Sequence, residues 1–174
     1  MSVAHRTPFG RPDADKKVLI SIPNTGNIHK LCLHAILRIC NEENTRLIAH
    51  GDIITPTHVP YENNLSHVMN DVLAKDYDFW INFDSDNPPR TNPVPLILEG
   101  KDIIGCPTPV WHFLNRPNER PMCWSAWDYD KDADAYGEHP PGNGLQQVDA
   151  IGTGCFMLSR KVVEARIPTP FCRI

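Results

Sequence analysis

The sequence predicts an α/β fold in which a mostly parallel central sheet is covered by helices on both faces. Apolar, strand-like runs alternate with helical patterns through the first 106 residues, and this alternation is typical of parallel sheets. The run at 18–22 is continuous and rich in β-branched residues, as expected for a strand buried on both faces. A chain of 174 residues is long enough for one domain with a substantial core.

The elements of this fold follow in a regular order. Residues 1–15 are polar and rich in Pro, Gly and Asp, so we expect a flexible N-terminal arm there. Residues 16–174 are expected to form a single domain. The patterns beyond the arm predict strands at 18–22, 46–50, 78–83 and 102–106, and helices at 28–40, 62–75 and 93–98. Asn27 is the expected N-cap of the first helix, and Asp52 is expected just beyond the second strand.

The alternation stops after the fourth predicted strand. Residues 107–144 are rich in Pro, Trp, Asp and Asn, and we expect an irregular excursion there. Order returns in a strand-like run at 146–160, and a helix is expected to begin at 162–165.

Composition excludes several classes of protein. The formal net charge is -4 and no basic block is present, so we do not expect a nucleic-acid partner. We find no apolar run long enough to cross a membrane and no signal peptide at the N-terminus. The six cysteines lack a CxxC spacing, and their apolar surroundings predict buried free thiols. A cytoplasmic location is therefore expected.

The strongest functional signal is Asp84-Ser85-Asp86, which directly follows the apolar strand at 79–83. Open parallel sheets bind ligands beyond the carboxyl ends of their strands. Two carboxylates at that position can hold Mg²⁺ or Mn²⁺, which favour oxygen ligands. The alternative is a plain turn, because Asp, Ser, Asn and Pro all favour turns. A metal site is the preferred interpretation, because two acids at the end of a buried strand are costly in a mere turn.

Four segments in a fixed order carry a family resemblance: 18–23, 62–64, 84–86 and 148–154. Together they span most of residues 16–165 and resemble the GT-A glycosyltransferases, especially family-two-like enzymes of bacteria and phages. The resemblance implies a GT-A-like, Rossmann-like three-layer sandwich. It also implies metal-dependent transfer of a sugar from a UDP- or GDP-sugar to a sugar or glycan acceptor, with Mn²⁺ or Mg²⁺ as the cofactor.

The same resemblance assigns roles to individual residues. The residues that it places at the nucleotide are Pro23, Thr25, Asp52, Asn63, Asp84 and Ser85. Asp84 and Asp86 are the implied metal ligands. The residues implied for the sugar and acceptor pocket are Asp149, Gly152, Thr153, Gly154 and Trp124. For the Gly-rich loop, glycine chemistry alone allows an ordinary bulge or turn instead. Many relatives carry an Arg where Asn63 stands, so its contact with the diphosphate is absent or comes from elsewhere.

The resemblance also has a departure at the C-terminus. Many relatives continue past the segment that resembles 168–171 into a pair of acids, whereas this sequence ends at Ile174. We therefore expect a truncated chain that lacks the usual general base and binds a donor better than it turns one over. Asp149 is the first candidate for a replacement base and His139 the second. A homodimer through the uncovered end is a further expectation.

Alternatives remain open for the function and for several side chains. A non-catalytic nucleotide-sugar-binding module would explain the missing base. A phosphohydrolase would use the first Asp of the triplet as a nucleophile, but that motif normally opens the domain. The aromatic residues of the excursion can stack on a sugar or can pack as core; they are Trp111, Trp124, Trp127, Tyr129 and Tyr136. His112 and His139 can serve as ligands or bases, or can simply be exposed or hydrogen-bonded.

Overall fold

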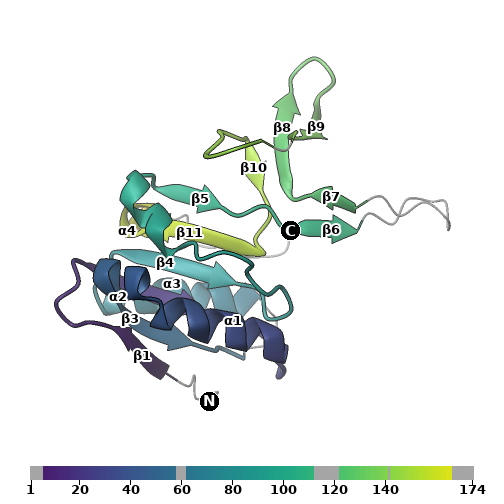
Figure 1. Ribbon diagram of the computed structural model, residues 1–174. Helices are drawn as coiled ribbons and strands as arrows, with labels where there is room; N and C mark the ends of the chain where they lie inside the picture. The colour runs from purple at the N-terminus through teal and green to yellow at the C-terminus, as the bar shows by residue number, and fades with distance from the viewer. Residues whose placement is uncertain (1–5, 58–61, 112–121, 141, 166–174) are drawn as a thin grey trace.

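A six-stranded sheet with helices on both faces forms the centre of the molecule, which is a mixed α/β structure (Figure 1). The structure is a computed structural model, and it describes residues 6–57, 62–111, 122–140 and 142–165. The strands, in their order across the sheet, are β1 (Arg6–Gly10), β3 (Ala49–Ile54), β2 (Lys16–Ser21), β4 (Phe79–Phe83), β11 (Cys155–Ser159) and β5 (Ile103–Gly105).

The directions of the strands are mixed, where the sequence predicted a mostly parallel sheet. β2 pairs in parallel with both β3 and β4. β1 is antiparallel to β3, and β11 is antiparallel to both of its neighbours, β4 and β5. β4 lies in the interior of the sheet, as predicted. Because β11 runs against β4, the first residues of β11 lie at the edge where β4 ends.

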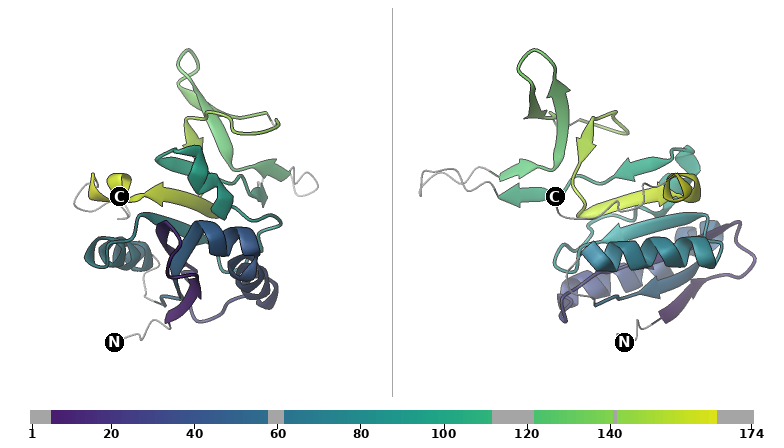
Figure 2. Two further views of the ribbon diagram at one scale, coloured as in Figure 1. Left: turned by 60° about the vertical axis from the view of Figure 1, so that its left-hand side comes forward. Right: turned by 180° about the vertical axis from the view of Figure 1, so that it is seen from behind.

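Helices cover the two faces of this sheet (Figure 2). One face carries α1 (Lys30–Asn41), α2 (Glu43–Ile48) and the 3₁₀ helix η1 (Val94–Glu99), and the other carries α3 (Glu62–Ala74) and α4 (Arg160–Glu164). Successive residues of β2 point to opposite faces, as the pleat of a strand requires. Val18 and Ile20 therefore pack with α1, whereas Leu19 packs with α3. The predicted burial of 18–22 on both faces is confirmed.

The predicted helices at 28–40, 62–75 and 93–98 are present with shifted ends, but one predicted strand is misplaced. The first helix begins at Lys30, and its N-cap is His29 rather than Asn27. The strand predicted at 46–50 is wrong, because residues 43–48 form α2 and the strand begins only at Ala49. The helix pattern of α2 is too short to be recognised from its apolar spacing. Asp52 consequently lies inside β3 instead of beyond it.

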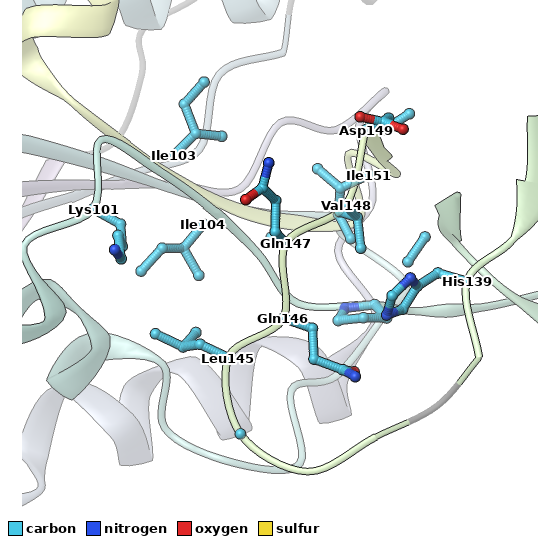
Figure 3. A pocket seen from close by; sticks show the side chains of 15 residues that line it. Lys101, Ile103, Ile104, His139, Leu145, Gln146, Gln147, Val148, Asp149 and Ile151 are labelled. Atoms are coloured by element: carbon cyan, nitrogen blue, oxygen red, sulfur yellow. The ribbon is translucent and has the colours of Figure 1, made fainter. Parts of the chain in front are cut away.

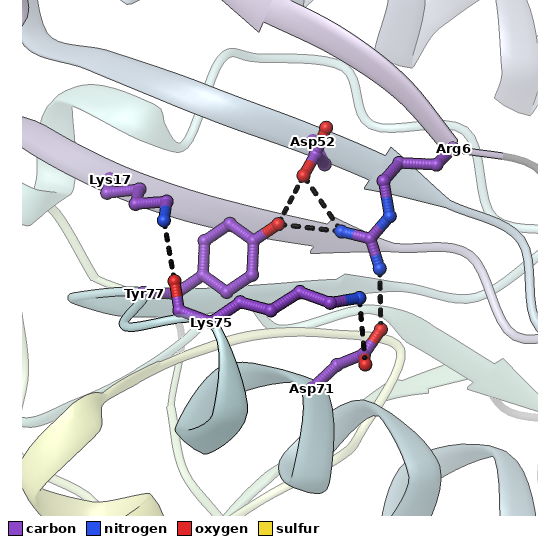
Figure 4. Close-up of polar contacts among 6 residues, drawn as sticks. All are labelled: Arg6, Lys17, Asp52, Asp71, Lys75 and Tyr77. Atoms are coloured by element: carbon purple, nitrogen blue, oxygen red, sulfur yellow. Dashed lines mark hydrogen bonds and ion pairs between the residues drawn. The ribbon is translucent and has the colours of Figure 1, made fainter.

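The N-terminal segment is fixed to the sheet, which corrects the expectation of a flexible arm for residues 6–10. Arg6 in β1 donates from Nη1 to Asp52 Oδ2 at 2.8 Å and to the Tyr77 hydroxyl at 2.7 Å, and from Nη2 to Asp71 Oδ2 at 2.7 Å (Figure 4). Tyr77 is itself buried and donates to Asp52. Partial burial alone would raise the pKa of Asp52, but the hydrogen bonds from Tyr77 and Arg6 hold it below its ordinary value.

The excursion at 107–144 also contains regular structure, contrary to the prediction. A two-stranded sheet joins β6 (Pro109–Trp111) to β7 (Met122–Trp124). A three-stranded sheet has the order β10 (Ala150–Ile151), β8 (Ala126–Asp130) and β9 (Ala135–Glu138), and it projects from the main sheet (Figure 1). All four residues of β9 are exposed, so this hairpin lacks the alternating apolar pattern by which strands are recognised. No helix in the described part of the chain is long and apolar enough to cross a membrane.

Candidate functional site

The acidic triplet stands at the carboxyl end of β4, where three neighbours fix its backbone. The amide of Asp84 donates to the Gly154 carbonyl at 2.9 Å, and the Ser85 carbonyl accepts the amide of His29 at 2.8 Å. The Cys32 thiol donates to the Asp84 carbonyl at 3.1 Å. Asp84 is half-buried, whereas Asp86 is exposed. The backbone is thus ordered by β11 and α1, and the carboxylate of Asp86 faces solvent.

The Gly-rich loop lies directly beside this triplet, so the structure brings together two of the predicted parts of the site. Besides the bond from Asp84 to Gly154, the amide of Gly152 donates to the Ser125 carbonyl at 2.7 Å. A Cβ atom on Gly154 would lie 2.7 Å from Thr108 Oγ1, and one on Gly152 would lie 2.6 Å from Ser125 Cβ. A side chain at Gly154 would therefore collide with Thr108, and one at Gly152 with Ser125, unless the neighbouring side chain moved.

A chain of buried polar groups runs behind the triplet. Trp80 Nε1 donates to Ser21 Oγ at 2.7 Å, and this hydroxyl donates to Asn82 Oδ1 at 2.7 Å. Asn82 Nδ2 in turn donates to the Thr153 carbonyl at 3.3 Å. All three side chains belong to residues with no exposed surface. Sequence reasoning missed Ser21 and Asn82, although a polar residue inside an apolar strand was a visible signal.

The end of β2 contributes to the same edge of the sheet. The Ile22 amide donates to the Ile54 carbonyl at 2.9 Å, and the Asn24 amide donates to the Pro56 carbonyl at 3.1 Å, so pairing with the β3 segment continues past both strands. Pro23 is buried and Thr25 is exposed.

Asn24 and Asn64 are site residues that the sequence did not predict. Asn64 Nδ2 donates to the Asn24 carbonyl at 3.4 Å, and this bond ties the start of α3 to the end of β2. Asn63, which was predicted at the nucleotide, is exposed in the first turn of α3 beside this contact. The predicted residues Pro23, Thr25 and Asn63 therefore lie around one corner of the sheet edge.

Asp52 does not join this group, and its predicted position at the edge is wrong. It lies within β3 opposite Leu19 of β2, and its carboxylate binds Arg6 and Tyr77. Tyr77 precedes β4, so this contact lies toward the end of β4 opposite Asp84. The error has one cause, the misplaced strand at 46–50.

A separate pocket of about 630 Å³ lies between β5 and the segment 144–151 (Figure 3). Both candidate bases line it, but the triplet does not. Asp149 is exposed, and its Oδ2 accepts the amide of Tyr129 at 2.8 Å. His139 Nδ1 lies 2.7 Å from Asp128 Oδ2, and its buried Nε2 has no hydrogen-bond partner within the described residues.

The remaining predicted residues of the acceptor side are scattered. Trp124, on β7, is 39% exposed and does not line the pocket. Tyr129 and Tyr136 face each other on the projecting hairpin, with ring centroids 5.2 Å apart. Neither tyrosine is core, since both are exposed. His112 and residues 168–171 lie outside the described part of the chain.

The structure has no cluster of three or more His, Cys, Asp or Glu side chains suited to a metal ion, among the residues that it describes. Asp84 and Asp86 are an acidic pair on one turn after β4. Their carboxylate oxygens are the donors that Mg²⁺ and Mn²⁺ prefer. A pair of this kind fits a cation whose remaining ligands come from water or from a bound phosphate group.

Comparison with known proteins shows a similarity in fold alone. No family model matches the chain, and no curated protein sequence matches it. Among solved structures, A197 from STIV superposes with a TM-score of 0.54 at 16% identity, over 87% of this chain and 69% of that one. This chain shares the fold of A197. HddC from Yersinia pseudotuberculosis gives a TM-score of 0.45 at 12% identity, over 90% of this chain and 82% of that one, which is too low to carry an argument.

Proposed function

We propose that this chain binds a nucleoside diphosphate sugar together with Mn²⁺ or Mg²⁺ at the carboxyl edge of the sheet, and acts as a glycosyltransferase of GT-A type. The observation that carries the proposal is the pairing of the acidic triplet with the Gly-rich loop, through the 2.9 Å bond from the Asp84 amide to the Gly154 carbonyl. An acidic pair suits a metal diphosphate, and this hydrogen bond holds the Gly-rich loop against the turn that carries the pair.

In this proposal the residues at the carboxyl edge of the sheet have separate roles. Asp86 and Asp84 hold the cation, whose charge stabilises the leaving diphosphate. Pro23, Thr25 and Asn63 border the nucleotide, because they surround the end of β2. Asp52 is excluded from the site, since its carboxylate is bound to Arg6 and Tyr77.

Asp149 is the proposed base that takes the proton of the acceptor hydroxyl. Its carboxylate is exposed and accepts one backbone amide, which leaves oxygen lone pairs for a hydroxyl. His139 is the second candidate, because Asp128 at Nδ1 orients the ring and leaves Nε2 as the proton acceptor in the neutral form; since Nε2 is buried, this role requires the surrounding chain to move. The Asp149→Asn and His139→Gln variants distinguish the two by their effect on transfer to an acceptor.

Isothermal calorimetry with UDP and GDP, with and without Mn²⁺, tests the binding step. We expect metal-dependent binding that Asp86→Asn weakens by at least about tenfold, which is about 1.4 kcal/mol. The matched control is Asp78→Asn at the other end of β4, where the amide oxygen can still accept the Lys17 amide; its binding should stay unchanged.

Three results would redirect the proposal. Absence of heat with either nucleotide and Mn²⁺ would refute nucleotide binding at this edge. Binding without acceptor-dependent release of the nucleoside diphosphate would leave a binding module in place of an enzyme. Hydrolysis of a simple phosphate ester that Asp84→Asn abolishes would favour a phosphohydrolase.

A further inference from the structure

Three thiols gather directly behind the acidic triplet. Cys32 comes from α1, Cys106 follows β5, and Cys155 opens β11. The Cys32 thiol donates to the Asp84 carbonyl, and Cys155 follows Gly154, the acceptor of the Asp84 amide. All five cysteines of the described residues are free.

Cys106 and Cys155 face each other across neighbouring strands. The register of β5 and β11 pairs Gly105 with Phe156, so the next pair is Cys106 with Cys155, and the Cys106 amide donates to the Cys155 carbonyl at 2.8 Å. Directly opposed residues of this kind have Cα atoms about 5.5 Å apart, within the range of about 4.4–6.8 Å found in disulfides. The two thiols are close enough that each shifts the pKa of the other.

The two thiols of this pair differ in character. Cys106 is partly exposed, and its hydrogen bond with Cys155 lowers its pKa even though burial acts in the opposite direction. Cys155 is buried, and the same hydrogen bond raises its pKa. The more exposed thiol with the lower pKa is the better attacking nucleophile at neutral pH, and the buried one stands next to it as the resolving thiol.

We propose that Cys106 and Cys155 are an oxidative modification site, which closes to a disulfide by exchange with a small-molecule disulfide and thereby weakens binding at the acidic triplet. The Cys106 thiolate attacks the small disulfide, whose sulfur–sulfur bond breaks to release one thiolate. The Cys155 thiol then loses its proton to solvent and attacks the Cys106 sulfur, which releases the second thiolate. Two protein thiols are oxidised, and one small disulfide is reduced to two thiols.

The consequence for the triplet follows from the geometry of the closed bond. Opposed Cβ atoms in a sheet are about 4.5–5.5 Å apart, whereas a disulfide brings them to about 3.8 Å. The two Cβ atoms must therefore move together by about 1 Å, which turns the backbone at this pair. Gly154 precedes Cys155 and accepts the Asp84 amide, and Thr108, close after Cys106, lies against Gly154. The movement therefore reaches the triplet, and a misplacement of this size is enough to weaken a ligand site. This consequence rests on the proposed function, but the disulfide itself does not.

Mass spectrometry of the protein after treatment with oxidised glutathione tests the chemical step. We expect the mass to fall by two hydrogens relative to the reduced protein, and peptide mapping to identify a Cys106–Cys155 link. Cys106→Ser, Cys106→Ala and Cys155→Ser should each abolish the link, and the control Cys123→Ser should retain it. Absence of the link in the wild-type protein, or a link of either cysteine to Cys32, would overturn the proposal.

Two measurements test the effect on the site. The oxidised protein should bind UDP or GDP with Mn²⁺ at least about tenfold more weakly, and dithiothreitol should restore the binding. The amide resonances of Asp84 and Gly154 should shift on oxidation, and this readout needs no nucleotide. A protein that carries the Cys106–Cys155 disulfide but keeps the same amide resonances and the same nucleotide affinity would refute the proposed effect of the disulfide on the triplet. If the reduced protein binds no nucleotide, the proposed function fails, while the link and the resonances still decide whether the thiol pair acts on the triplet.

Discussion

Replacing Ser21 by Ala removes the central hydroxyl of the polar chain behind the site. The hydroxyl accepts from Trp80 Nε1 and donates to Asn82 Oδ1, in both cases at 2.7 Å, and all three residues are fully buried. Each buried group that loses its partner costs about 1–3 kcal/mol. With two such groups we expect a loss of about 3 kcal/mol in the free energy of unfolding. For a chain of this length, that lowers the melting temperature by roughly 6–12 °C.

Urea unfolding followed by tryptophan fluorescence, together with a thermal melt, measures this loss. The matched control is Ser66→Ala on α3, where the residue is only half-buried; its stability should stay within about 0.5 kcal/mol of the wild type. The same Ser21 variant should also weaken nucleotide binding, because Asn82 holds the Thr153 carbonyl of the Gly-rich loop. A Ser21 variant within about 1 kcal/mol of the wild type would refute the stabilising role of the polar chain.

Three further outcomes are expected. The pKa of Asp52 is lowered in the fold. Its contribution to the free energy of unfolding is therefore complete above the unfolded pKa of about 3.9 and is lost as the pH falls through the acid range. Urea unfolding between pH 3 and 7 should show this loss of stability toward low pH, and Asp52→Asn should reduce it. Gly154→Ala should lower the free energy of unfolding by about 1–3 kcal/mol, because the added methyl group overpacks against Thr108. In the control Gly137→Ala the added methyl group meets no atom within 4 Å, and the melting temperature should stay unchanged. Tyr77→Phe should cost about 1.5–3 kcal/mol in urea unfolding because Tyr77 bonds two charged groups, and an unchanged midpoint would contradict that estimate.

The sequence predicted those elements whose apolar periodicity is strong. The apolar stripe of α3 has the helical period. The short runs of β2 and β4 are rich in β-branched or aromatic residues and are followed by turn residues, which favours strands, and all three elements are present. The triplet and the Gly-rich loop were also recognised, because each directly borders such a run. Their contact through Asp84 and Gly154 follows from the antiparallel direction of β11.

The parts that could not be predicted depend on partners far along the chain. β1 is held by the ion pairs of Arg6 with Asp52 and Asp71, and no local pattern in residues 1–15 reveals those partners. The short helix α2 has too few apolar residues for its period to be recognised. Because this helix was not predicted, the next strand was predicted too early in the sequence, and Asp52 was placed beyond its end. The β8–β9 hairpin is largely exposed, so its strands show no alternation of apolar and polar residues. The buried pair Ser21 and Asn82 lies inside apolar runs whose register only the sheet defines.

The position of β11 has a consequence for the order in which the chain folds. Within the described residues, β5 has β11 as its single neighbour in the sheet, and the outer edge of β4 is likewise paired with β11. β11 is the last strand of this sheet among the described residues. β5 therefore cannot pair until β11 is in place, and one edge of β4 stays unpaired until then. Such long-range pairings are slow to form because loop closure must come first. The pairing of β11 with β4 also brings the Gly154 carbonyl to the Asp84 amide. Protection of the Asp84 amide from hydrogen exchange should therefore appear together with protection of the β5 amides.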